Sequence, residues 1–275
     1  MIDTTSKVRE HYAAPGLTDA IKSALARIAP EDQTLTVAQL APLDQFHVRG
    51  IFATRELATA AGLDVSTCVL DVGCGIGGPA RYLATTFGCR VTGVDLSPGF
   101  IDAATYLTAR CRLSDRVMFQ AGDAQHLPFQ NGGFDAVFLQ HVAMNIEDRA
   151  ALYAEVHRIL TPGGRFAIYD VVLRDGEVVY PVPWARDAST SFLLTEGDTR
   201  TALEYAGFES VLWRDDSDIV VDWFTKTMGG PPPGEPGVNL GVVLGPDFQA
   251  MTANLARNIR KRRLGVLSAV LTRGT

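Results

Sequence analysis

Three glycines set the strongest constraint on how this chain folds. Gly73, Gly75 and Gly78 form a G-x-G-x-x-G pattern in VLDVGCGIGGPARYLA (residues 69–84), after an apolar run and before an amphipathic segment. Glycine adopts backbone angles closed to other residues and lets a ligand approach the main chain closely. The N-terminus of the following helix favours negative groups. The pattern predicts a strand–turn–helix unit at a nucleotide site, although dinucleotide folds and some structural turns share the spacing.

Short apolar runs recur around this turn and alternate with amphipathic segments. The runs cover residues 66–72, 89–95, 116–122, 134–140 and 165–172. They are continuously apolar, which indicates strands covered on both faces, as in a parallel sheet. The alternation of strands and helices predicts a doubly wound α/β fold.

Both ends of the chain depart from this central pattern. Residues 1–62 are expected to be helical, with an apolar stripe of Leu17, Ile21, Leu25 and Ile28 and a second helix over 51–61 that Gly62 ends. The tail is expected to form helices over 195–207, 217–228 and 247–262, strands over 209–215 and 264–271, and a Pro- and Gly-rich loop over 229–237.

A carboxylate strengthens the case for a nucleotide site. Asp95 ends the second apolar run, 20 residues after Gly75, where an acid can accept hydrogen bonds from both hydroxyls of a ribose. Ser97 is a better N-cap for the next helix than Asp95, because Pro98 then takes the first helical position. The glycines and Asp95 together fit both NAD and S-adenosylmethionine (SAM).

Five motifs in a fixed order narrow this choice. DVGCGIGG, VDLS, GDAQHLPF, FDAVFLQHV and LTPGG follow one another across residues 66–172, and the series resembles class I SAM-dependent methyltransferases. The resemblance implies a Rossmann-like, seven-stranded, mostly parallel sheet with an antiparallel last strand, helices on both faces and SAM as the cofactor. An NAD-dependent oxidoreductase shares the glycines and Asp95 but not GDAQHLPF.

The resemblance also assigns cofactor-binding roles. Gly73, Cys74 and Gly75 would pass beneath the methionine part of SAM, and Asp71 would either orient that loop or reach the cofactor amine through water. Asp95 would bind the ribose and Leu96 would pack on the adenine. The remaining contacts would come from Asp123 and the Ala124 amide to the adenine, and from the Gln140 carbonyl to the methionine ammonium.

A closer resemblance concerns two further segments. LAPLDQFHVRG (residues 40–50) and QHVAMNIEDR (residues 140–149) are similar to sarcosine/dimethylglycine and phosphoethanolamine methyltransferases, and more distantly to quinone C-methyltransferases. This implies an N-terminal helical lid over residues 1–62 that includes Tyr12, Gln45 and His47. The SAM-binding domain would cover 63–275, with acceptor-site insertions around 173–195 and 217–262.

The expected reaction is methyl transfer to a small-molecule acceptor, with an amine nitrogen favoured. Alignment and exclusion of water are the main tasks of such an enzyme. His141 and His47 are the candidate bases, since imidazole titrates near neutrality. Tyr12, His141, Asp170 and Trp184 are the candidate acceptor contacts, although Asp170 could instead cap a turn. O- or C-methylation of a natural product, quinone or prenyl-type acceptor and a non-catalytic SAM-binding role are the open alternatives.

Composition excludes several other classes of protein. A formal charge of −6 gives nucleic acid no overall attraction, and no apolar run reaches the roughly 18–20 residues that span a bilayer. The four cysteines lack C-x-x-C spacing and are expected to be free thiols in a reducing, cytoplasmic compartment. Gln140 and His141 stand where catechol-type enzymes carry a metal-binding acid, so no metal is expected.

Overall fold

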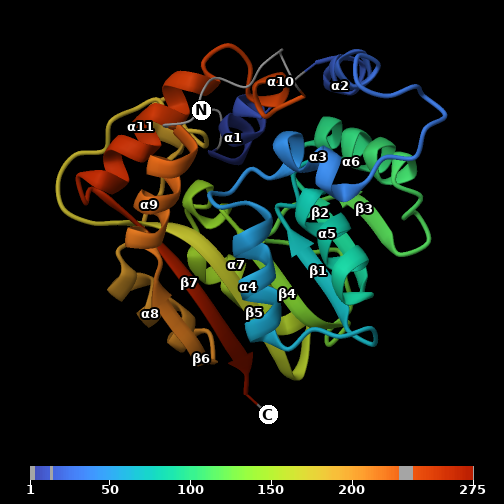
Figure 1. The fold of residues 1–275 in the computed structure, drawn as a ribbon. Coiled ribbons are helices and arrows are strands. Elements are labelled where there is room, and N and C mark those ends of the chain that lie inside the picture. Colours follow the sequence, from blue (N-terminus) through green and yellow to red (C-terminus); the bar gives the residue numbers. More distant parts are fainter. Residues whose placement is uncertain (1–3, 13–14, 229–237, 275) are drawn as a thin grey trace.

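A single twisted sheet of seven strands organises the computed structural model, which describes residues 4–12, 15–228 and 238–274 (Figure 1). The strands are β1 (Cys68–Val72), β2 (Arg90–Asp95), β3 (Val117–Ala121), β4 (Phe134–Gln140), β5 (Leu160–Leu173), β6 (Phe208–Asp215) and β7 (Leu264–Arg273). Their order is β3-β2-β1-β4-β5-β7-β6. Only β7 is antiparallel to its neighbours, β5 and β6. The predicted sheet, with its antiparallel last strand, is confirmed.

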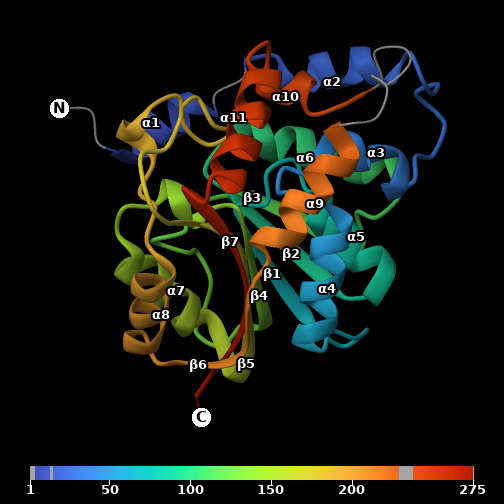
Figure 2. The same ribbon diagram turned by 60° about the vertical axis from the view of Figure 1, so that its left-hand side comes forward.

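Helices cover both faces of the sheet and its carboxyl edge (Figures 1 and 2). They are α1 (Thr4–His11), α2 (Leu17–Leu25), α3 (Val37–Asp44), α4 (Ile51–Ala61), α5 (Gly78–Phe87), α6 (Pro98–Arg110), α7 (Arg149–Ile159), α8 (Glu196–Tyr205), α9 (Ser217–Met228), α10 (Gly241–Leu244) and α11 (Phe248–Arg260). Helices α4, α5, α9 and α11 share one apolar cluster with the sheet, and α7 and α8 share a second on the other face.

A third apolar cluster lies at the carboxyl edge of the sheet. It joins α2, α3, α6 and α10 through side chains such as Ile21, Leu40, Phe100 and Val243. This cluster joins the N-terminal helices α2 and α3 to α6 and α10 above the strand ends (Figure 1). Because the parallel strands point their carboxyl ends here, ligands of such folds bind at this edge.

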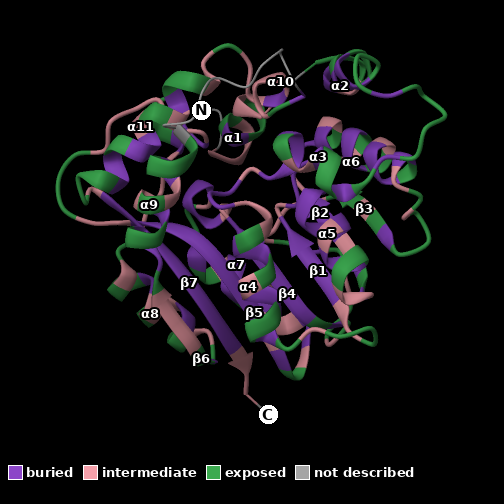
Figure 3. Ribbon diagram, viewed as in Figure 1, coloured by how far each residue is buried: buried purple, intermediate pink, exposed green. Residues whose placement is uncertain are grey.

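The central strands are the most deeply buried part of the molecule (Figure 3), whereas the edge strands β3 and β6 are largely exposed or half-buried. Strand β7, for example, is buried at eight of its ten positions. Continuous burial on both faces explains why its sequence is uniformly apolar rather than alternating. The inference of covered strands from unbroken apolar runs is therefore correct for the centre of the sheet.

Two N-terminal expectations need adjustment. Ile28 was placed on a helical stripe, but α2 ends at Leu25 and the Ile28 side chain is 49% exposed. Helix α4, assigned to the lid over 1–62, instead packs on the sheet face, where Leu57 and Ala58 join the core. The expected loop at 229–237 lies outside the described residues.

Candidate active site

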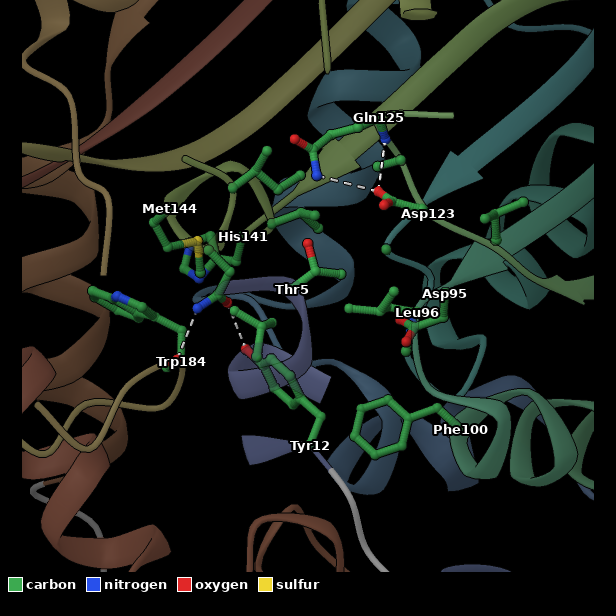
Figure 4. Close-up of a pocket in the computed structure, with 18 of the residues that line it drawn as sticks. Thr5, Tyr12, Asp95, Leu96, Phe100, Asp123, Gln125, His141, Met144 and Trp184 are labelled. Carbon is green, nitrogen blue, oxygen red and sulfur yellow. Dashed lines mark hydrogen bonds between the residues drawn. The ribbon is translucent and has the colours of Figure 1, made fainter. Parts of the chain in front are cut away.

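A cavity of about 360 Å³ opens at the carboxyl edge of the sheet. Ten of the predicted site residues line it: Tyr12, Gly73, Gly75, Asp95, Leu96, Asp123, Ala124, Gln140, His141 and Trp184. Figure 4 shows Asp95, Leu96 and Asp123 along one wall, with His141, Met144 and Trp184 along the opposite one. The predicted residues Asp71, Cys74, His47 and Asp170 are not part of the lining.

The glycine turn after β1 forms the floor of the cavity. Gly73 and Gly75 adopt φ values of 69° and 54°, in the left-handed region that glycine enters without strain. The Gly73 amide donates to the Val94 carbonyl at 2.7 Å, which ties the turn to β2. A Cβ at Gly73 would lie 2.3 Å from Cγ2 of Val142. Packing as well as backbone angle therefore requires glycine at position 73.

Asp95 links the end of β2 to the glycine turn. Its two carboxylate oxygens accept hydrogen bonds at 2.9 Å from the amides of Gly75 and Ser97. Each oxygen keeps a further lone pair that can accept from a ligand hydroxyl. Burial, opposed by these amide hydrogen bonds, raises the pKa of Asp95 to about 6. Ser97 caps α6 with its own hydroxyl, as predicted.

Asp71 lies behind this turn and is almost completely buried. Its Oδ2 atom has no hydrogen-bond partner among the described residues. Burial, and then the neighbouring charge of Asp95, raise the pKa of Asp71 to about 8. No cationic side chain contributes to the pKa of either carboxylate. Two buried acids without a counter-ion suit a site that receives a positively charged ligand, such as a sulfonium or ammonium.

Cys74 and Asp123 complete the surroundings of the turn. The Cys74 thiol is buried, and its pKa is raised chiefly by that burial. Asp123 accepts a hydrogen bond from the Gln125 amide at 2.9 Å and also lines the cavity. The turn role and the ligand role that the sequence allowed for Asp123 are thus compatible.

His141 stands on the opposite wall in a strained backbone conformation, with φ at 55°. Its amide donates to the Tyr169 carbonyl at 2.8 Å, and its ring stacks on that of Tyr169 with centroids 5.7 Å apart. The Nε2 atom is buried without a partner. Burial, and then the nearby His47, hold the pKa of His141 well below its usual value, so the ring is neutral at pH 7.

His47 lies behind His141, outside the cavity. Its Nε2 atom is 3.0 Å from both the Gly50 carbonyl and the Thr54 hydroxyl, and the Thr54 hydroxyl donates to Oε1 of Gln140 at 3.0 Å. Burial lowers the pKa of His47 to about 4. The candidate base His47 is therefore placed in a chain of hydrogen bonds that holds Gln140, with no contact to the cavity.

Asp170 is likewise a supporting residue rather than an acceptor contact. Its carboxylate accepts from the amides of Ala143 and Val171, both at 2.9 Å. The first bond fixes the short turn that follows His141. Of the two roles considered for Asp170, the geometry corresponds to the cap of a turn.

Asn145 joins three parts of the acceptor wall, and the sequence did not single it out. Its Nδ2 donates to the carbonyls of Trp184 and Thr190 at 2.9 and 2.8 Å. Its Oδ1 accepts from the hydroxyl of Tyr12 at 2.9 Å. Asn145 stood within QHVAMNIEDR, but nothing in that segment reveals contacts to residues 39 positions later or 133 earlier.

The remaining lining residues come from segments far apart in sequence. Helix α1 adds Thr4, Thr5 and Val8, and α10 adds Leu244. No cluster of three or more potential metal ligands occurs among the described residues. Within the same residues, every helix is too short or too polar to span a bilayer.

Residues 70–168 match the family model described as a methyltransferase domain. The match places the glycine turn, Asp95 and Asp123 within a stretch that resembles a methyltransferase domain. A sterol 24-C-methyltransferase of Saccharomyces cerevisiae is 32% identical over 184 residues, which cover 63% of this chain and 48% of the relative. The chain thus spans about half the length of the curated relatives it matches.

Solved structures with this methyltransferase fold carry varied chemistry. The [4+2]-cyclase SpnF aligns with a TM-score of 0.70 at 23% identity, over 99% of this chain and 98% of its own. A geranyl diphosphate C-methyltransferase from Streptomyces coelicolor A3(2) aligns with a TM-score of 0.71 at 15% identity, over 99% and 98%. A putative sarcosine dimethylglycine methyltransferase from Galdieria sulphuraria aligns with a TM-score of 0.61 at 19% identity, over 81% and 84%. At these identities the likeness concerns the fold alone.

Proposed function

We propose that this chain transfers a methyl group from SAM to a carbon atom of a small, apolar acceptor. The observation that carries the proposal is a single cavity whose two walls have different chemistry. One wall offers carboxylates and glycine amides, and the other offers aromatic and thioether groups with a neutral histidine. The matched sterol relative favours carbon over the amine nitrogen that the motifs suggested.

The residues of the donor wall fit SAM. Asp95 keeps lone pairs for ribose hydroxyls, Leu96 supplies an apolar face for adenine, and the unpartnered Asp71 carboxyl can ionise to supply negative charge behind the turn when a cationic donor binds. When bound, SAM supplies a methyl group on a positively charged sulfur, an electrophile that needs no metal. The protein's part is to hold donor and acceptor in line and to exclude water.

The acceptor wall suits an apolar group that gains positive charge during the reaction. Trp184 and Tyr12 provide aromatic faces, which attract cations. Two acids also line the cavity: Glu147 accepts a hydrogen bond from the Thr4 hydroxyl, and Asp148 caps α7.

His141 has the properties of a base that acts after methyl transfer to an alkene. The alkene's electron pair would form the new C–C bond to the methyl group as the methyl–sulfur bond breaks and its electron pair stays on sulfur, which would leave positive charge on the adjacent acceptor carbon. Loss of a proton from the neighbouring carbon restores the double bond, and Nε2 of His141 is the proposed proton acceptor. Its low pKa keeps it unprotonated and ready at neutral pH.

A product assay with methyl-labelled SAM tests the proposal. The panel pairs terpenoid alkenes and sterols with amines of similar size, and mass spectrometry with NMR locates the transferred methyl. We expect label on carbon. Label on nitrogen would refute the carbon assignment. SAM binding without transfer to any member of the panel would instead favour a non-methylating role, as the fold shared with a cyclase allows.

A further inference from the structure

A second cavity lies beside the first and shares part of its wall. It measures about 220 Å³ and lies between the end of α1, the start of α6, and the segment from α10 into α11. Tyr12, Phe100 and Leu244 line both cavities. The two spaces are therefore separated by a layer only one side chain thick. Figure 1 shows α1, α10 and α11, three helices beside this cavity's lining residues, grouped above the carboxyl edge.

The first cavity is small for the task that the proposed function gives it. Pockets for one drug-sized ligand measure about 300–1,000 Å³, whereas this cavity of about 360 Å³ must hold both SAM and the reacting part of the acceptor. Any acceptor longer than its reacting end needs additional space. The neighbouring cavity is the adjacent space, and Val243, Leu244 and Met251 contribute apolar side chains to a lining that also includes His11 and Arg186.

Tyr12 is the most prominent part of the dividing layer. Its hydroxyl donates to Oδ1 of Asn145, on the acceptor wall. Its ring meets that of Phe100 edge to face, with centroids 5.8 Å apart, and the two rings lie next to each other in Figure 4. The side chain is thus fixed at its tip by a hydrogen bond and along its ring by an aromatic neighbour.

We propose that Tyr12 sets the length of acceptor chain that the first cavity admits, because its ring closes that cavity against the second. With Tyr12 in place, the acceptor chain stops at the ring. Without the ring, the two cavities join, and the second holds the distal part of a longer apolar chain. Arg186, exposed and paired with Asp247 at 2.6 Å, also lines the second cavity. This inference rests on the proposed function.

Binding of a chain-length series tests the proposal without turnover. Calorimetry would measure the affinity of unbranched primary alcohols of increasing length, with S-adenosylhomocysteine present to fill the donor site. Each buried methylene contributes about 0.8 kcal/mol, or about fourfold in affinity. We expect wild-type affinity to rise with length and then stop rising. In Tyr12→Ala the rise continues, so an alcohol two carbons past the wild-type limit binds about fifteenfold tighter than to wild type.

Tyr12→Phe is the matched control, because it removes the hydroxyl but keeps the ring, and it should retain the wild-type limit. Leu244→Ala is an independent opening of the same layer and should extend the limit as Tyr12→Ala does. The same limit in wild type and both alanine variants would overturn the proposal, as would a wild type without a limit. Failure to bind S-adenosylhomocysteine at all would refute the proposed function instead.

Discussion

The buried carboxylate of Asp71 allows a sharp prediction about pH and stability. Burial raises the pKa of Asp71 to about 8 in the folded protein, against an ordinary value of 3.8 for an aspartate. Between these two values the folded state binds more protons than the unfolded state. By linkage, the free energy of unfolding must then fall as the pH rises through this window.

The magnitude follows from the width of the window. Each pH unit contributes about 1.4 kcal/mol for a fully buried group that is protonated in one state only. From pH 4 to pH 7 the ligand-free protein should therefore lose about 4 kcal/mol because of Asp71. Asp71→Asn has nearly the same shape and cannot ionise. At pH 7 this variant should be about 4 kcal/mol more stable than wild type, and the two should converge near pH 4.

Urea denaturation of both proteins at pH 4, 5, 6 and 7, without SAM, provides the measurement. The Asp95 carboxylate, whose pKa is also raised, is present in both proteins, so the difference between them isolates Asp71. A cationic methyl donor should reverse the order of stability of the two proteins, because it stabilises the ionised Asp71 carboxylate. SAM should therefore bind wild type more tightly than the variant, and its binding should release a proton near pH 7. Stability curves of wild type and variant that stay parallel from pH 4 to 7 would refute this reasoning.

Three further substitutions test other parts of the site. Gly73→Ala places a methyl group 2.3 Å from Val142 in a left-handed backbone, and calorimetry should show SAM binding at least about tenfold weaker. Arg81→Met removes the ion-pair partner, 2.8 Å away, of the fully buried Asp44. Urea denaturation should show that the free energy of unfolding falls by about 3–5 kcal/mol. An unchanged free energy of unfolding would mean that the pair adds nothing to stability. His141→Gln should lower kcat about 10²–10⁴-fold while SAM affinity stays unchanged, and equal losses of both would argue against a role in proton transfer.

The sequence predicted best those features that local chemistry decides. The glycine turn, Asp95 and the Ser97 cap depend on backbone angles and on neighbours a few residues away, and all have the geometry that their spacing indicated. The sheet was also predictable, because burial on both faces leaves unbroken apolar runs in each strand. The turn at Asp123 was also predictable from local chemistry, because it is formed by the residues that follow Asp123 directly.

The opposite wall of the cavity was harder to predict, because tertiary contacts decide which of its polar groups are hydrogen-bonded within the protein. His47 and Asp170 looked like residues free to meet an acceptor. In the fold, the His47 ring is hydrogen-bonded to the Thr54 hydroxyl and the Gly50 carbonyl, and the Asp170 carboxylate accepts a hydrogen bond from the Ala143 amide. The sequence does not show whether a histidine or an aspartate forms its hydrogen bonds within the protein or with a ligand. Only the partners, which the fold brings together, separate the two cases.

The same reasoning explains where acceptor choice would reside in the proposed methyltransferase. The donor wall is built from one continuous stretch of chain, so its residues are constrained together and leave a recognisable series of motifs. The acceptor wall is assembled from α1, α10 and the loop that carries Trp184, which meet through single contacts such as Tyr12 to Asn145. Changing one such contact reshapes the acceptor space without touching the cofactor residues. Acceptor identity can therefore change while the motif series stays intact, so these motifs predict the cofactor far better than they predict what is methylated.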